Sequence, residues 1–467
     1  MAAIITNKFR IHNAEQFYES FSEAAATNYY LFIGRPQPFT TTTGGGTDSA
    51  PPTPADNQVS ETGHWRDMIA AKRVVAGDVE FVIPRRNWTT GTVYDYYRPD
   101  YSTTITANSG ATILSDATYH VVTDDWRVYK CMWNNSGAAS TVEPTGTGNT
   151  EFSTGDSYVW KYMFTLTTTQ VQNHVTTDFI PVTDTLGTIS GNSQSTVSSN
   201  AVDGEIRRIL ISTAGAGYTN GTYTDVDISG DGSSGKCTVV ISGNTVTSVT
   251  ITAQGTGYKF ADVNVDGISG IGTPSVSAVL LPLVGPRGGH GYDAINELCA
   301  FYVMTNTALV STEGSGDFIV DQDFRRIGLV RNPYNHGTTT VATLATLSAL
   351  KSVTFAASPT PGTFVVDEVL TGGTSGAKAK VASWDAANRK LYYIQTQYTG
   401  IDADKNITAF ATSEIITGTD SSATGTISAL NNPEIDHHSG DVMYVEHRAP
   451  ITRATDQTEN IKLVMEF

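Results

Sequence analysis

Apolar residues near the start of the chain recur with two different periods. Residues 13–26 repeat at about 3.6 residues with Asn13 as a plausible N-cap, which predicts an amphipathic helix. The aromatic and apolar run 29–34 that follows is stopped by a glycine and a proline, so we predict a buried strand there. The chain is therefore expected to open with a helix and then a strand.

A second pair of elements is expected soon after. Residues 65–75 place apolar side chains on one face of a helix, and residues 79–83 alternate as a strand that ends at Pro84. Residues 40–62 are mostly Thr, Gly, Pro and Asp with no pattern to bury, which predicts a loop.

Beyond residue 100 the pattern is that of strands. Short aromatic and β-branched runs are separated by Gly, Asn and Ser turns, which is typical of a mainly β protein. These runs are residues 118–122, 126–133, 156–166 and 178–182. From residue 185 the composition changes to Ser, Thr, Asn and Gly, which indicates a linker leading into an inserted unit.

Two internal repeats follow the linker. Residues 211–218 (ISTAGAGY) recur as 251–258 (ITAQGTGY), an offset of 251 − 211 = 40. In each copy the glycines are expected to take positive φ and turn the strand, and the tyrosine to cover the turn with its ring. The predicted turn residues are Gly215, Gly217, Tyr218, Gly255, Gly257 and Tyr258. The second repeat pairs residues 368–381 with 414–427, an offset of 414 − 368 = 46, and predicts another small β module over 350–432.

Composition narrows the classes of partner. Of the 467 residues 16% are charged, and the formal net charge is 29 − 46 = −17, which disfavours nucleic acid and anionic membrane surfaces. The longest apolar stretch, 278–284, is too short to cross a membrane as a helix. The N-terminus lacks a secretory signal pattern, so we expect folding in a cytosol, with Cys131, Cys237 and Cys299 as reduced core residues.

Candidate chemistry is sparse. The glycine-rich stretches lack the GK[ST] context of a phosphate loop, so turns are favoured. Residues 434–441 (EIDHHSGD) hold potential metal ligands, but adjacent histidines on a strand point to opposite faces, so a solvated loop is favoured. His64, His290 and His336 are expected to be surface or capping histidines. No catalytic, cofactor-binding or metal residue is assigned, and we expect the protein not to be an enzyme.

One basic corner stands apart in this acidic chain. Arg85 and Arg86 leave a strand end directly after Pro84 and lie next to Trp88 in sequence. Guanidinium groups pair with carboxylates and stack on aromatic rings, which suits either an interface with a partner or a clamp within the core. Both interpretations remain open at this point.

Several stretches, taken in order, resemble a known family. They are residues 5–21, 29–39, 82–88, 126–132, 155–164, 324–333 and 438–467. The strongest are VIPRRNW (82–88), GDSYVWKYMF (155–164) and DQTENIKL (456–463). Together they are similar to the smaller dimeric baseplate wedge proteins of T-even-type contractile-tailed phages.

The resemblance carries expectations about fold and role. It implies a β-sandwich core with a small α/β portion, a homodimer that bridges other wedge subunits, a place in the virion tail baseplate after synthesis in the bacterial cytoplasm, and no catalytic activity or cofactor. The segments around 196–284 and 350–432 lie outside it and are similar to decorations of cyanophage tail proteins. The expected map is a core of 1–195, 285–349 and 433–467 with inserted β modules at 196–284 and 350–432.

Two other functions compete with this one. A tail-surface binding module would use the insertions to contact host glycans or fibre proteins, with exposed Tyr residues and Trp384 stacking on sugars. A tail-associated hydrolase would need a convergent acid and base pair, and the sequence indicates none.

Overall fold

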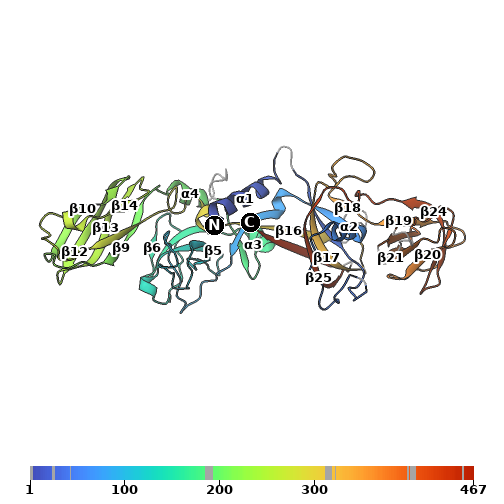
Figure 1. Ribbon diagram of the computed structural model, residues 1–467, viewed down its shortest axis with the longest axis horizontal. Helices are drawn as coiled ribbons and strands as arrows, with labels where there is room; N and C mark the ends of the chain where they lie inside the picture. The colour runs from blue at the N-terminus through green and yellow to red at the C-terminus, as the bar shows by residue number, and fades with distance from the viewer. Residues whose placement is uncertain are drawn as a thin grey trace. The chain divides into compact units, whose positions relative to one another are not determined.

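The computed structural model describes residues 4–23, 27–42, 44–184, 193–310, 318–320, 322–396, 399, 406–454 and 457–467. Antiparallel sheets predominate, so the expectation of a mainly β fold is confirmed. The chain forms two compact units, each built from segments that are distant in sequence (Figure 1). Unit 1 contains Met1–Glu15, Glu80–Met304 and Val464–Phe467, and unit 2 contains Gln16–Val79 and Thr305–Leu463. The residues expected to form one core are thus divided between both units.

The elements are as follows, with those that cross a unit boundary named first. They are α1 (Asn7–Glu19), β3 (Val79–Pro84), β16 (Tyr302–Val310) and β26 (Thr458–Glu466). Unit 1 also has β4 (His120–Val122), β5 (Arg127–Trp133), β6 (Phe152–Ser153), β7 (Val159–Thr165), α3 (Thr168–His174), β8 (Phe179–Pro181), α4 (Ser193–Ser199), β9 (Ile206–Thr213), β10 (Gly221–Asp227), β11 (Ser229–Gly230), β12 (Ser233–Ser242), β13 (Thr245–Thr256), β14 (Ala261–Asp262), β15 (Val279–Val284) and α5 (Ala294–Glu297). Unit 2 also has β1 (Tyr29–Gly34), α2 (Gln58–Arg66), β2 (Met68–Val74), β17 (Asp323–Arg331), β18 (Thr346–Ser348), β19 (Lys351–Phe355), β20 (Val369–Gly372), β21 (Lys378–Asp385), β22 (Lys390–Ile394), β23 (Ile415–Gly418), β24 (Thr424–Asn431) and β25 (Asp441–Thr452). Short 3-10 turns are η1 (Ala76–Asp78), η2 (Leu114–Asp116), η3 (Asn135–Gly137) and η4 (Val265–Gly267).

Unit 2 is organised around a five-stranded antiparallel sheet in the order β18-β2-β1-β17-β25. The predicted strand at 29–34 is β1, which lies between β2 and β17 in the sheet, and every one of its residues is buried. Phe32 lies opposite Gly328 of β17, where an added Cβ would stand 2.3 Å from the phenyl ring. Position 328 therefore requires glycine, because the Phe32 ring lies directly against its backbone.

Two helix predictions are corrected. The predicted helix 65–75 is the end of α2, capped by Asn57, followed by strand β2. Both faces of β2 are covered at Met68–Ala71, so its apolar run shows no alternation and resembles a buried helix segment. The loop expected over 40–62 consequently ends where α2 begins. The first helix of the described residues lies at Asn7–Glu19, so Asn13 is inside it and is not its N-cap. Residues 24–26 of the predicted helix lie outside the described residues.

Unit 1 contains the sheet β4-β5-β7-β6, which corresponds to three of the predicted strand runs. Its core is a cluster of aromatic side chains with a few small apolar ones. The buried members are Tyr94, Val121, Tyr129, Cys131, Tyr158, Trp160, Tyr162 and Val197. Cys131, Cys237 and Cys299 are all buried and unpaired with one another, as expected of reduced core thiols.

Each repeat-bearing segment has its own core, and its first and last strands are neighbours. In the first module β9 pairs with β15, so that Ile206 lies opposite Val284, and the next pair outward is joined by a 3.0 Å hydrogen bond from the Gly285 N–H to the Glu205 carbonyl. The second module is a closed barrel in the order β19-β22-β21-β20-β23-β24. Its closing pair places Ser352 opposite Asn431.

Candidate functional site

The Arg85–Trp88 corner makes intramolecular contacts with neutral groups. Arg85 donates to the Thr176 carbonyl (2.9 Å) and lies over the Trp126 ring. Arg86 donates to Nδ1 of His120 (2.9 Å), and His120 then donates from Nε2 to the Pro84 carbonyl (3.0 Å). Burial and the Arg86 charge lower the pKa of His120 to about 3, so this ring is a neutral relay between the guanidinium and the backbone.

Trp88 completes this corner. Its indole N–H donates to the Ser140 hydroxyl (3.2 Å), and the ring packs against the aromatic cluster of unit 1. These contacts fix the corner within unit 1. A further role of the corner at an interface stays a prediction.

The turn glycines of the first repeat have positive φ values of 68° and 88° at Gly215 and Gly217, and 64° and 76° at Gly255 and Gly257. The tyrosines do more than cover the turns. Tyr218 donates to Asp266 (2.6 Å) and accepts from the Ala278 N–H (2.6 Å). Tyr258 donates to the Ile228 carbonyl (2.8 Å) and accepts from the Gly235 N–H (3.2 Å). Both rings are buried, so the hydrogen bonds of each tyrosine anchor its turn to the core of the module.

The barrel contains a reciprocal pair of buried carboxylates that sequence reasoning missed. Glu368 accepts from the Asp420 N–H and from the N–H and hydroxyl of Ser421, which belong to the second copy of the repeat. Glu414 accepts from the Thr374 N–H and from the N–H and hydroxyl of Ser375, which belong to the first copy. The glutamate of each copy therefore accepts the hydrogen bonds of the turn in the other copy.

A local two-fold axis relates the two halves of this arrangement. Thr371 of β20 lies opposite Thr417 of β23, its own equivalent at the offset of 46 (417 − 371). The signal was present in the sequence, because both copies of the repeat begin with a glutamate at the same position. Its meaning depended on the pairing of β20 with β23, which the sequence alone did not reveal.

Unit 1 also holds a fully buried ionic cluster. The Lys130 ammonium pairs with the Glu297 carboxylate, donates to Nδ1 of His290 (2.8 Å) and lies 4.9 Å from the centre of the Tyr97 ring. Glu297 also accepts from the Gly291 N–H (2.8 Å). Burial and the Lys130 charge hold the pKa of His290 well below its ordinary value, so the ring accepts as a neutral base. The cluster binds the segment after the first module to β5.

Two expectations about histidine are therefore corrected. His64 and His290 are buried rather than at the surface, and burial together with a nearby Arg326 or Lys130 charge lowers the pKa of each ring. In the 434–441 segment His437 donates from Nε2 to the Ala349 carbonyl (3.0 Å), whereas His438 is exposed. Among the described residues no three His, Cys, Asp or Glu side chains are grouped as metal ligands.

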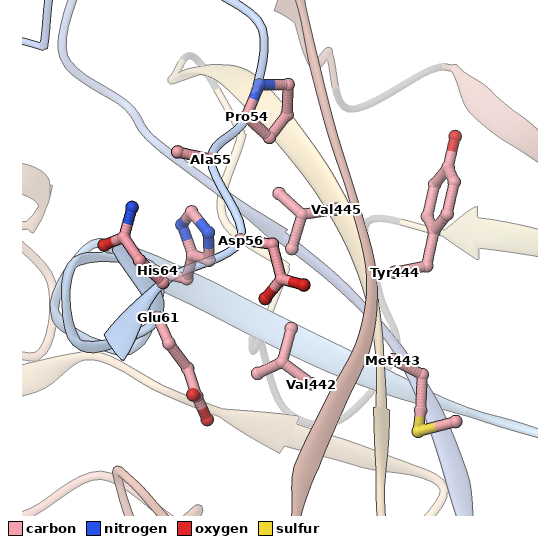
Figure 2. Close-up of a pocket in the computed structure, with 10 residues that line it drawn as sticks. Pro54, Ala55, Asp56, Glu61, His64, Val442, Met443, Tyr444 and Val445 are labelled. Atoms are coloured by element: carbon pink, nitrogen blue, oxygen red, sulfur yellow. The ribbon is translucent and has the colours of Figure 1, made fainter. Parts of the chain in front are cut away.

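Unit 2 carries a surface pocket of about 340 Å³ between α2 and β25 (Figure 2). Figure 2 shows Asp56, Glu61 and His64 on one side of β25, with Val442 and Val445 facing them. A neighbouring cavity of about 190 Å³ shares His64 and is lined by arginines. In it Arg326 pairs with Asp67 and donates from Nε to Nε2 of His447 (3.1 Å).

Comparison with known proteins accounts for the N-terminal part of the chain. Residues 3–134 and 124–192 match the family described as Bacteriophage T4, Gp8. The resemblance to this baseplate wedge family is confirmed. A curated relative, the baseplate wedge protein gp8 of Enterobacteria phage T4, is 27% identical over 210 residues. That alignment covers 38% of this chain and 60% of the relative, so the chain spans about 60% of the relative's length.

The match to the Gp8 family ends just before the first module. It includes β5 and β7, which supply Lys130 and the aromatic core of unit 1, and β1 and β2 in the sheet of unit 2. Arg85, Arg86 and Trp88 also lie within it. Over the described residues, no helix is long and apolar enough to cross a membrane.

Proposed function

We propose that this chain is a non-enzymatic structural subunit of a phage tail baseplate wedge, assembled into the virion after synthesis in the host bacterial cytoplasm. The observation that carries the proposal is the match of residues 3–192 to the Gp8 family, together with a relative that is named a baseplate wedge protein. The match includes buried strands of both units, β1 and β2 of unit 2 and β5 and β7 of unit 1. A reconstruction of the assembled tail with this chain located in the baseplate tests the proposal, and its placement elsewhere in the virion would contradict it.

The finer part of the proposal is a homodimer that bridges neighbouring wedge proteins. Its support is the family resemblance. Light scattering on the purified chain should give twice the mass of 49.9 kDa. A single-chain mass that persists at the highest soluble concentration would contradict the homodimer and leave the baseplate location untouched.

We also propose that residues 196–284 and 350–432 are insertions that the rest of the chain can lose. The support is that the first and last strands of each module pair with one another, at Ile206 and Val284 and at Ser352 and Asn431. Replacing either segment by a short Gly/Ser linker should leave a folded protein, since the ends to be joined are already adjacent. Aggregation of both shortened chains would contradict this map.

The Arg86 contacts support a core clamp. Arg86→Met removes the donor to His120. Arg85→Met removes a guanidinium whose partners are the Asn87 amide oxygen, a backbone carbonyl and an aromatic face. Arg86→Met should lower the melting temperature with the oligomer mass unchanged, and Arg85→Met should lower it less. A loss of wedge-partner binding with an unchanged melting temperature would assign the corner to an interface instead.

A tail-surface binding module for host glycans or fibre proteins remains the alternative. Trp384, the ring singled out for stacking, packs against Phe355 and Phe364 at ring-centre distances of 5.7 and 5.4 Å. This packing favours a structural role for Trp384. A glycan array probed with the intact chain distinguishes the two functions.

A further inference from the structure

A further cavity of unit 2, of about 260 Å³, lies where the second module joins the rest of the unit. Its lining combines Arg66 from the end of α2, Lys351 from the start of β19 and Gln395, which directly follows β22, with residues of the segment 433–438 that comes after β24. Strands β19 and β24 are the first and last strands of the barrel and pair with one another. Both ends of the module therefore border this cavity.

Two cations of the lining have no carboxylate partner. Among the described residues Lys351 makes no hydrogen bond or ion pair, and burial alone lowers the pKa of its ammonium group. The Arg66 guanidinium likewise has no hydrogen bond or ion pair in the described part of the chain, and its Nε is buried. The carboxylate of the lining, Asp436, lies 3.7 Å from His336. Even with every histidine neutral, the lining carries an excess of 2 − 1 = 1 positive charge.

Two other residues of the lining carry acceptors that lack a donor. Gln395 donates from its amide nitrogen to the Lys378 carbonyl (3.0 Å) and to the Thr408 carbonyl (2.9 Å), which fixes the orientation of the amide. Its Oε1 is buried without a hydrogen-bond partner. His437 donates from Nε2 to the Ala349 carbonyl (3.0 Å), so its Nδ1 is an acceptor, and the described residues offer it no donor. The cavity thus combines unpaired cations with unpaired acceptors.

We propose that this cavity binds a phosphate group together with a hydroxyl donor, either as free hydrogen phosphate or as a phosphorylated polyol. The phosphate oxygens accept from Lys351 and Arg66, and these charge-assisted hydrogen bonds are strong because neither cation has another acceptor. The hydroxyl group donates to Oε1 of Gln395 or to Nδ1 of His437. An anion that carries acceptor oxygens alone, such as sulfate, satisfies the cations but leaves both of these acceptors without a donor.

Two substitutions remove the cations one at a time. Lys351→Met keeps the aliphatic stem and deletes an ammonium group that has no partner to lose, so the melting temperature of the ligand-free chain should be unchanged or higher. Arg66→Gln deletes the guanidinium group. Lys390→Gln is the matched control, because it removes the same charge from β22 of the same barrel, outside this lining, where Lys390 lies 4.7 Å from the centre of the Tyr392 ring. A melting temperature of Lys351→Met that falls by several degrees would show a structural partner for Lys351 and overturn the proposal.

The probes are inorganic phosphate, glycerol 3-phosphate and sulfate, each titrated into the full chain by calorimetry near neutral pH and at constant ionic strength. We expect saturable binding of one phosphate or glycerol 3-phosphate per chain, at least tenfold weaker in Lys351→Met and in Arg66→Gln and unchanged in Lys390→Gln. Sulfate should bind at least tenfold more weakly than phosphate.

The two phosphate probes distinguish the sources of the ligand. Tighter binding of inorganic phosphate identifies the free ion, and tighter binding of glycerol 3-phosphate identifies a phosphorylated polyol. Absence of saturable binding, an affinity for sulfate equal to that for phosphate, or equal weakening in Lys390→Gln would overturn the proposal.

Discussion

The reciprocal glutamates of the barrel allow a quantitative prediction. Glu368→Gln and Glu414→Gln should each destabilise the barrel, and by similar amounts, because the local two-fold axis gives the two carboxylates equivalent partners. Each accepts from a turn of the opposite repeat copy and from the N–H three residues before it, that of Val365 (2.7 Å) or Ala411 (2.6 Å). The residues are 1% and 3% exposed, so water does not replace these bonds freely.

The magnitude follows from the bonds that glutamine cannot make. A glutamine amide retains one accepting oxygen and turns an NH₂ group towards at least one of the backbone N–H donors. Leaving one buried donor unsatisfied costs about 1–3 kcal/mol, and losing the carboxylate charge weakens each of the remaining bonds, which are worth about 1.5–3 kcal/mol when charged. We therefore expect about 2–4 kcal/mol for each substitution.

Hydrogen exchange measured by mass spectrometry resolves this effect in the intact chain. Peptides from residues 351–394 and 415–431, which contain the six barrel strands, report the opening of this module separately from the rest. A loss of about 2–4 kcal/mol corresponds to exchange faster by about 30- to 1,000-fold in the slowest barrel amides. The control is Asp420→Asn, which removes the same charge from an exposed side chain of the same turn.

Unchanged exchange in both glutamine variants would refute the reasoning, as would a large effect in one and none in the other.

The two carboxylates should also make the stability of the barrel depend on pH. Burial would raise the pKa of Glu368 and Glu414, but hydrogen bonds from Ser421 and Ser375 and their neighbours outweigh it and lower the pKa of both. Their contribution is therefore complete above the unfolded value of about 4.3 and is lost as pH falls through the lower folded pKa.

Three further outcomes are expected. Lys130→Met should lower the free energy of unfolding by about 3–5 kcal/mol, measured by chemical denaturation, because the buried carboxylate of Glu297 loses its counter-ion. Replacing both residues by apolar ones should restore much of the lost free energy. Gly255→Ala should lower the melting temperature more than Gly243→Ala. The two glycines have similar φ values, but the added Cβ would stand 2.6 Å from a tyrosine ring at position 255 and would meet no atom within 4 Å at position 243. Deletion of 459–467 removes two buried apolar side chains of β26 and should abolish soluble protein, as judged by light scattering of the cleared lysate.

Sequence periodicity predicted strands wherever one local pattern decided the structure. The run at 29–34 is a strand because its apolar residues, bounded by breakers, fit a buried central position. The same reasoning failed at 68–74, where side chains on both faces of the strand are buried at Met68–Ala71 and the period of two disappears. Helix α1 was displaced because its apolar face is weak, with only Ile11 and Ala14 buried.

The charged clusters were beyond sequence reasoning for a different reason. Lys130 and Glu297 are separated by 167 positions, and Asp67 and Arg326 by 259. Which carboxylate meets which cation depends on strand order and register, and a solvated charge has the same sequence signature as a buried one. By contrast, the arginine pair at 85–86 was visible as an unusual feature of an acidic chain, and only its partners were hidden.

The pairing of first and last strands in each module has a consequence for how such chains change over time. Because Ile206 lies opposite Val284, the rest of the chain must bridge only the spacing of neighbouring strands, about 5 Å, however many residues lie between them. A single contiguous stretch of coding sequence can then be gained, lengthened or exchanged in one recombination event while the flanking strands keep their register. The same holds at Ser352 and Asn431, so the two sites can acquire new surfaces independently of each other.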